Sequence, residues 1–205
     1  MFLEIVALVV SFGAIAIIVL WTVLTGSPPT PTSPNVRRSM IAILPTHLTG
    51  ESVGRVYELG SGWGGISRAL AVHFNSIQVI GIEISPLPFA SSWLINVLSP
   101  KSNLKLSYGN FFDTDLSDAA LVVCYLSRDA LIRLAPKLER ELAPEALVLS
   151  STFGIPGWKA INRGFAPDLY KSPIYLYERS EAVARWSQER VSGSTSGINT
   201  FRTRE

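Results

Sequence analysis

The most distinctive chemistry in this sequence lies in a glycine-rich stretch, ELGSGWGG, which follows a short apolar run and precedes a helical pattern. Gly60, Gly62 and Gly65 form the pattern G-x-G-x-x-G, which lets the backbone approach a ligand at the positive end of a helix. Glu83 ends the next apolar run, where a carboxylate can hold ribose hydroxyls. The pattern predicts a nucleotide-type cofactor and, by itself, does not distinguish NAD from other adenosine cofactors.

Three further features narrow this choice. Glu58 stands directly before the glycines, where it would repel a pyrophosphate but would attract the ammonium group of a free amino acid. Asn110 follows a third apolar run and can hydrogen-bond an adenine edge. The chain after residue 153 is patterned as an antiparallel hairpin, which is not typical of a dehydrogenase. S-adenosylmethionine accounts for all three features.

These motifs resemble the class I, seven-strand S-adenosylmethionine-dependent methyltransferases over about residues 42–179, through ELGSGWG, GIEISP and GNF. A narrower resemblance is to the single-pass membrane lysine methyltransferases of the adenine nucleotide translocase and ATP synthase c-subunit type, with their prokaryotic relatives. It rests on LPT (44–46), GIEISP (81–86), KLERELAPEALVLSSTFGIPGW (137–158) and IYLY (174–177).

The resemblance implies a role for each matching residue. Glu58 would meet the methionine ammonium group, the glycine loop would wrap the cofactor, Glu83 would hold the ribose, and Asn110 with Phe111 would frame the adenine. Trp63 departs from the small or acidic residue usual in the family and should lie near the reacting methyl group. The expected cofactor-binding residues are Glu58, Leu59, Gly60, Ser61, Gly62, Gly64, Glu83, Ile84, Asn110 and Phe111.

Methyl transfer from a sulfonium is an in-line displacement that needs an aligned, deprotonated acceptor and the exclusion of water. Aromatic side chains at the carboxyl ends of the later strands would form such an environment, and we expect Tyr125 and Trp158 to act at the acceptor. The alternatives are that Tyr125 is a half-buried strand residue and that Trp158 fills the core beneath the hairpin.

Short apolar runs alternate with longer helical patterns between residues 55 and 153, and these runs and patterns predict the strands and helices that position the residues above. This alternation predicts an α/β fold: a Rossmann-like seven-stranded methyltransferase sheet with an antiparallel C-terminal hairpin, preceded by one transmembrane helix. The expected division is an anchor at 1–24, a Pro-rich linker at 25–40, the methyltransferase domain at 41–180, and a short helix with a mobile tail at 181–205. The prolines at 25–34 predict an extended spacer in the first part of the linker.

Residues 5–24 carry no charge, and about 20 helical residues span the roughly 30 Å hydrocarbon core of a bilayer. A signal peptide would have a basic leading segment and a core helix would be amphipathic, so we favour a retained anchor with Trp21 at an interface. Arg37 and Arg38 follow the span and no basic residue precedes it. This asymmetry predicts a single-pass membrane protein with its domain on the cytoplasmic side, with a bacterial inner membrane favoured.

Composition excludes several other classes of protein. The chain has 18 basic and 16 acidic residues without basic blocks, which argues against a nucleic-acid partner. One Cys and two His give neither a disulfide nor a metal site at zinc spacing. We therefore expect protein-lysine methylation of a membrane-proximal substrate, with a small-molecule or lipid methyltransferase, or a non-catalytic S-adenosylmethionine-binding membrane module, as the alternatives.

Overall fold

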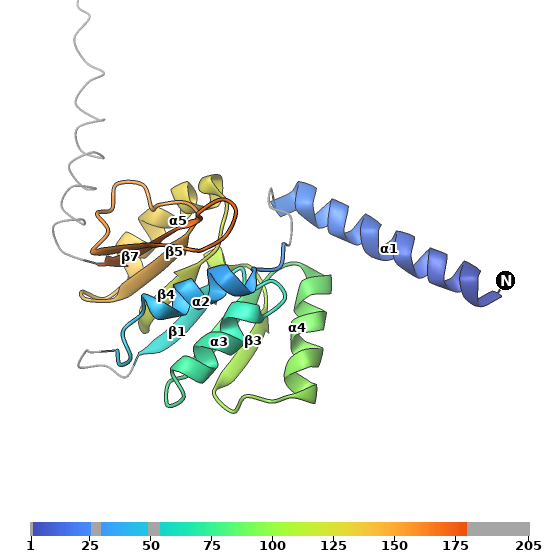
Figure 1. Ribbon diagram of the computed structural model, residues 1–205, viewed down its shortest axis with the longest axis horizontal. Helices are drawn as coiled ribbons and strands as arrows, with labels where there is room; N and C mark the ends of the chain where they lie inside the picture. Colours follow the sequence, from blue (N-terminus) through green and yellow to red (C-terminus); the bar gives the residue numbers. More distant parts are fainter. Residues whose placement is uncertain (1, 26–29, 49–53, 180–205) are drawn as a thin grey trace, which may run out of the picture.

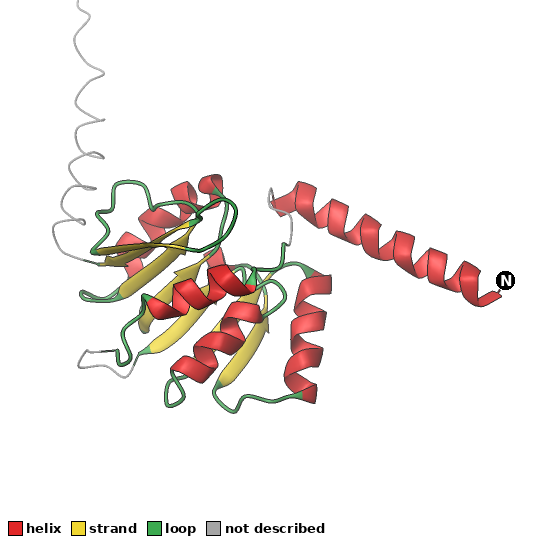
Figure 2. Ribbon diagram, in the orientation of Figure 1, coloured by secondary structure: helices red, strands yellow, loops and turns green. Residues whose placement is uncertain are grey.

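The alternating apolar runs fold into one sheet that is covered by helices on both faces (Figures 1 and 2). The computed structural model describes residues 2–25, 30–48 and 54–179. Within these residues the sheet has seven strands in the order β3-β2-β1-β4-β5-β7-β6. The strands are β1 (Arg55–Leu59), β2 (Val79–Glu83), β3 (Leu104–Tyr108), β4 (Ala119–Cys124), β5 (Leu147–Ser151), β6 (Asn162–Phe165) and β7 (Pro173–Glu178).

The first five strands are parallel, and β7 pairs antiparallel with both β5 and β6. All residues of β2 are buried, as expected for a parallel strand covered on both faces. The strand order reverses between β1 and β4, and ligands of open α/β sheets bind at such a point, beyond the carboxyl ends of the strands. The predicted α/β sheet with its antiparallel C-terminal hairpin is confirmed.

The helices cover the sheet in the way that right-handed crossovers require. Side chains alternate along β1: Val56 packs in one core with α2 and α3, and Tyr57 packs in the other with α5. A short helix, η1, follows β3. The helices are α1 (Phe2–Thr25), α2 (Pro34–Ala42), α3 (Gly65–His73), α4 (Pro86–Leu98), η1 (Phe111–Asp113) and α5 (Arg128–Glu141).

Helix α2 changes the expected linker. The sequence predicts an extended spacer at 25–34 within a Pro-rich linker at 25–40, and in the structure a helix begins at Pro34, inside that linker. The Ser33 hydroxyl accepts a hydrogen bond from the Val36 backbone N–H, and Pro34 occupies the first turn, where its missing N–H has no cost. Val36 and Met40, one turn apart, are buried against the core. Residues 34–40 therefore belong to the folded domain, while the expected helix and tail at 181–205 lie outside the described residues.

Helix α1 is long and apolar enough to cross a membrane, by length and composition. Its end contacts the domain, where the Trp21 indole Nε1–H donates to the backbone oxygen of Ile84 at 2.8 Å. Ile84 directly follows β2 and lies two residues before α4 begins. The apolar helix therefore joins the domain at the carboxyl edge of the sheet.

Candidate active site

Strand register brings three predicted site residues to one edge of the sheet: Glu58 in β1, Glu83 at the end of β2, and Tyr125 directly after β4. Leu59, the last residue of β1, pairs with Ile82 of β2 on one side and with Cys124 of β4 on the other. The chain beyond each strand therefore opens on a common cavity of about 820 Å³. Among the residues that line it are Arg37, Glu58, Gly60, Ser61, Gly62, Trp63, Glu83, Ile84, Asn110, Phe111, Phe112, Tyr125, Asp129, Arg133 and Phe153.

The glycine loop is held open by hydrogen bonds to the neighbouring strand. The backbone N–H groups of Gly60 and Ser61 both donate to the Ile82 oxygen at 2.9 Å. Gly60, Gly62 and Gly64 have φ values of 74°, 52° and 76°, which side-chain-bearing residues rarely adopt. These positive φ values explain why three glycines are needed to turn the chain from β1 into α3.

Glu83 fixes the loop from the end of β2. One of its carboxylate oxygens accepts the Gly62 N–H and the other accepts the Ser85 N–H, both at 2.7 Å. Each oxygen retains further acceptor capacity toward the cavity, which is the property needed to hold hydroxyl groups. The carboxylate is therefore held in place before any ligand arrives.

Glu58 is almost fully buried at the base of the same cavity. Burial raises the pKa of its carboxyl to about 8, a nearby Glu83 adds to the rise, and hydrogen bonds from Ser67 oppose it. The Ser67 hydroxyl donates to the Glu58 carboxylate. Gly81 makes room for this pair, because a Cβ there would lie 2.5 Å from the Ser67 hydroxyl. A buried carboxyl with a raised pKa facing a cavity is suited to receive a ligand's positive charge.

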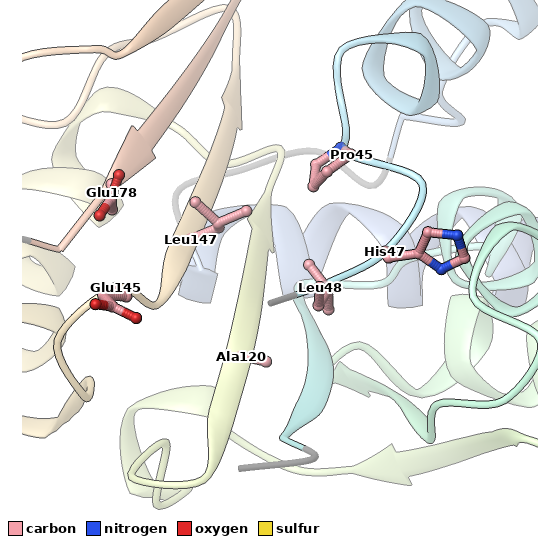
Figure 3. A pocket seen from close by; sticks show the side chains of 7 residues that line it. All are labelled: Pro45, His47, Leu48, Ala120, Glu145, Leu147 and Glu178. Atoms are coloured by element: carbon pink, nitrogen blue, oxygen red, sulfur yellow. The ribbon is translucent and has the colours of Figure 1, made fainter. Parts of the chain in front are cut away.

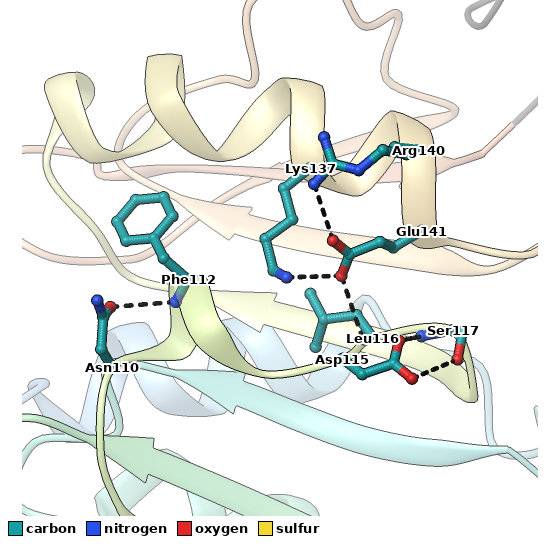
Figure 4. Close-up of polar contacts among 8 residues, drawn as sticks. All are labelled: Asn110, Phe112, Asp115, Leu116, Ser117, Lys137, Arg140 and Glu141. Atoms are coloured by element: carbon teal, nitrogen blue, oxygen red, sulfur yellow. Dashed lines mark hydrogen bonds and ion pairs between the residues drawn. The ribbon is translucent and has the colours of Figure 1, made fainter.

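The segment after β3 forms another wall of the cavity, through Asn110, Phe111 and Phe112. Asn110 caps η1, because its side-chain oxygen accepts the Phe112 N–H at 3.1 Å. The chain that follows η1 is linked to α5 (Figure 4): the Glu141 carboxylate of α5 accepts the Leu116 N–H, and Lys137 donates to the same carboxylate at 2.6 Å. The Phe111 and Phe112 rings contact each other, giving an aromatic surface beside the Asn110 amide. This wall has the flat, apolar and hydrogen-bonding character that a purine needs.

Tyr125 and Trp158 differ in their placement. Tyr125 follows β4 and lines the cavity, with 36% of its surface exposed. Trp158 is buried, meets the Tyr177 ring edge-on, and donates from Nε1 to a Glu139 oxygen at 3.2 Å. Its position corresponds to the alternative of a side chain that fills the core beneath the hairpin. Phe153, on the loop after β5, supplies an aromatic surface of the cavity.

Eight of the ten expected cofactor residues line the cavity, and Leu59 and Gly64 do not. Leu59 is fully buried in the core, and Gly64 caps the amino end of α3. Arg37 of α2 also lines the cavity, and sequence reasoning missed this role. Its guanidinium lies beside the start of α3, where a Cβ on Gly65 would be 3.0 Å from Nη1. The signal that could have revealed it is the Ser-Pro capping pattern at 33–34, which predicts a helix and not a spacer.

A second cavity, of about 260 Å³, lies where β4 and β5 begin (Figure 3). The Glu145 and Glu178 carboxylates lie on one side of it, and the His47 ring lies across from them. It contains none of the predicted site residues. The cavity at the carboxyl ends of the strands is therefore the candidate active site.

A parallel sheet with its glycine loop after the first strand, and an antiparallel strand inserted beside the fifth, is the class I methyltransferase fold. Solved structures of methyltransferases share this fold. An RNA methyltransferase from Salinibacter ruber in complex with S-adenosyl-L-homocysteine aligns at a TM-score of 0.62 and 24% identity, covering 74% of this chain and 95% of that one. A putative methyltransferase from Escherichia coli aligns at 0.58 and 16%, covering 74% and 88%. These likenesses show that the chain has the class I methyltransferase fold.

Sequence comparison narrows the class. The family model described as the ANTKMT methyltransferase domain matches residues 58–162, half of the chain. A curated protein-lysine N-methyltransferase from Saccharolobus islandicus is 35% identical over 133 residues, which are 64% of this chain and 80% of that protein. The chain therefore belongs to the ANTKMT methyltransferase domain family and is an S-adenosylmethionine-dependent methyltransferase.

Proposed function

We propose that this protein transfers a methyl group from S-adenosylmethionine to lysine side chains of a protein close to a membrane. The observation that carries the proposal is the 35% identity with a curated protein-lysine N-methyltransferase. The site adds a chemical argument, because Tyr125, Phe153 and Asp129 line the cavity, and aromatic faces and carboxylates attract a cationic acceptor.

The residues of the cavity suit S-adenosylmethionine group by group. Glu58 would pair with the methionine ammonium group, and Arg37 with the methionine carboxylate. Glu83 would accept hydrogen bonds from the ribose hydroxyls. The Asn110 amide and the Phe111 ring would hold the adenine. The bound cofactor supplies an electrophilic methyl group on a sulfonium, and the protein aligns the acceptor with it.

A lysine acceptor must lose its proton before it can attack. At an unperturbed pKa of about 10.4, the neutral fraction at pH 7 is about 10 to the power −3.4, so the site must offset roughly 4.6 kcal/mol. The Tyr125 and Phe153 rings, which line the cavity, would favour the neutral amine by excluding water. We propose that Tyr125 borders the acceptor nitrogen.

The membrane part of the proposal rests on α1. Residues 1–24 would anchor the chain, a short connection would follow, and the domain would lie on the cytoplasmic side, where Arg37 and Arg38 favour its retention. Tethering raises the local concentration of membrane-bound acceptors without any new contact. With residues 34–40 already folded into the domain, the connection is shorter than the expected 25–40 linker.

The test is transfer of radiolabelled methyl groups into membrane and soluble fractions of cells that lack the gene. Full-length protein is added, and Glu58→Ala serves as the control. A discrete protein band that the control lacks, and that yields methyl-lysine on hydrolysis, supports the proposal. Label only in solvent-extractable material identifies a lipid or small-molecule acceptor. Cofactor binding without any label identifies a non-catalytic binding module.

A further inference from the structure

Helix α4 presents its apolar side chains to the outside of the domain. Its thirteen residues contain no charged side chain. The residues buried against the sheet are Pro88 and Ser92, which are small. The exposed ones are large and apolar, from 41% to 76% exposed: Trp93, Leu94, Ile95, Val97 and Leu98. A surface helix of a soluble domain has the opposite pattern, so this face is expected to meet an apolar environment.

The position of α4 indicates which environment this is. Helix α1 contacts α4 and leaves the domain beside it (Figure 1). The Trp21 indole of α1 bonds the Ile84 oxygen just before α4 begins. Tryptophan near the end of a membrane span sits at the level of the lipid headgroups. If α1 spans the bilayer as proposed above, the first turn of α4 lies at that level too.

Polar groups at the far end of α4 fit the same surface. Arg68 of α3 donates to the Asn96 side chain at 3.3 Å and to the Ser99 backbone oxygen at 2.9 Å, which holds a guanidinium beside the last turn of α4. Lys101 and Lys105 follow within the next seven residues. Cations next to an exposed apolar helix are the pattern of helices that lie in the plane of an anionic membrane surface.

We propose that α4 lies in the interface of the bilayer that holds α1, with Trp93, Leu94, Val97 and Leu98 among the acyl chains near the headgroups. The inference rests on the proposed anchor and adds a second attachment that fixes the orientation of the domain. The domain is then attached at two places, the end of α1 and the length of α4. These attachments hold the carboxyl edge of the sheet, where Ile84 lies, against the membrane. Because Ile84 lines the active-site cavity, acceptors at the membrane surface reach the site directly.

The experiment measures the lipid contact of single positions in the full-length protein, reconstituted in vesicles of phosphatidylcholine and phosphatidylglycerol. Val97→Cys on α4 and Val72→Cys on α3 are a matched pair, since both valines are exposed, at 55% and 62%. Leu8→Cys reports on α1. The native Cys124 is fully buried, so an environment-sensitive fluorophore will label only the introduced thiol. Lipids with a nitroxide on the acyl chain serve as the quencher.

We expect strong quenching at positions 8 and 97, with at least threefold more quenching at 97 than at 72. Equal quenching at 97 and 72, with position 8 quenched, would overturn the inference and leave the anchor intact. Absence of quenching at position 8 would refute the anchor and, with it, this inference. A probe at 97 that is blue-shifted, unquenched and sensitive to dilution of the protein would assign the face to a second copy of the chain.

Discussion

The proposed pairing of Glu58 with the cofactor ammonium group predicts that cofactor binding depends on pH. Burial raises the pKa of its carboxyl to about 8 in the free protein, so about nine tenths of the molecules carry a proton there at pH 7. Pairing with the cofactor ammonium group requires the carboxylate form. Binding at pH 7 should therefore release about 0.9 proton from Glu58. The cofactor amine, with an ordinary pKa of about 7.7–8.0, takes up about 0.1, which leaves a net release of about 0.8.

The same numbers give the change in affinity. Because about a tenth of the free protein is ionised at pH 7, the apparent Kd should be about tenfold above that of the ionised form, or about 1.4 kcal/mol weaker. Raising the pH toward 8 tightens binding as Glu58 loses its proton. Above pH 8 the cofactor amine loses its own proton and binding weakens again. The apparent affinity should thus be greatest near pH 8.

Calorimetry with S-adenosylhomocysteine measures the released protons, since the apparent binding enthalpy then depends on the ionisation enthalpy of the buffer. Wild-type protein is compared in phosphate and Tris at pH 7 with Glu58→Gln, in which the release should be replaced by an uptake of about 0.1 proton. Methylthioadenosine, which lacks the amino-acid part, should show no release with either protein. A wild-type binding enthalpy that is the same in both buffers would refute the assignment of Glu58.

Three further outcomes test the rest of the site. Arg37→Met should raise the Kd of S-adenosylhomocysteine about tenfold or more, since a charge-assisted hydrogen bond contributes about 1.5–3 kcal/mol, with kcat unchanged at saturating cofactor. Tyr125→Phe keeps the ring and removes only the hydroxyl proposed to border the acceptor nitrogen, so it should lower kcat about tenfold without a change in Tm. Trp158→Ala should reduce the free energy of unfolding by about 3–5 kcal/mol and retain kcat below its Tm. The reverse result would support the prediction that Trp158 acts at the acceptor. Thermal melts of the cofactor-free protein test the raised pKa of Glu58. The folded state holds the Glu58 proton more tightly than the unfolded state does, so the protonated carboxyl adds to the free energy of unfolding at low pH. This contribution is lost as the pH rises through about 8. The Tm of Glu58→Gln minus the Tm of wild type should therefore increase from pH 6 to pH 9. A difference in Tm that stays constant over this range would contradict the raised pKa.

Local patterns in the sequence were sufficient to predict the sheet and many of the residues that line the candidate active site. The glycine loop, Glu58 and Glu83 follow from the spacing of residues around two apolar strands, because parallel strands end at a common edge. Arg37 and Trp158 depend instead on packing between distant segments. Arg37 reaches the cavity only because α2 buries Val36 and Met40 on α3 and the sheet, and Trp158 is buried by the antiparallel strand that contains Tyr177.

Arg37 illustrates how a residue can serve in topology and later in binding. With Arg38 it is a basic residue close to the apolar span, and in the folded chain its side chain lines the active-site cavity. The two roles do not conflict, because the basic residues near a span act on its orientation during insertion, before the domain has folded. After folding, Arg38 bonds Asn35 on the surface at 2.6 Å, and the cations nearest the proposed membrane face are those beside α4. The orientation of the anchor therefore depends on the sequence around α1, whereas the proposed attachment of α4 depends on the folded surface.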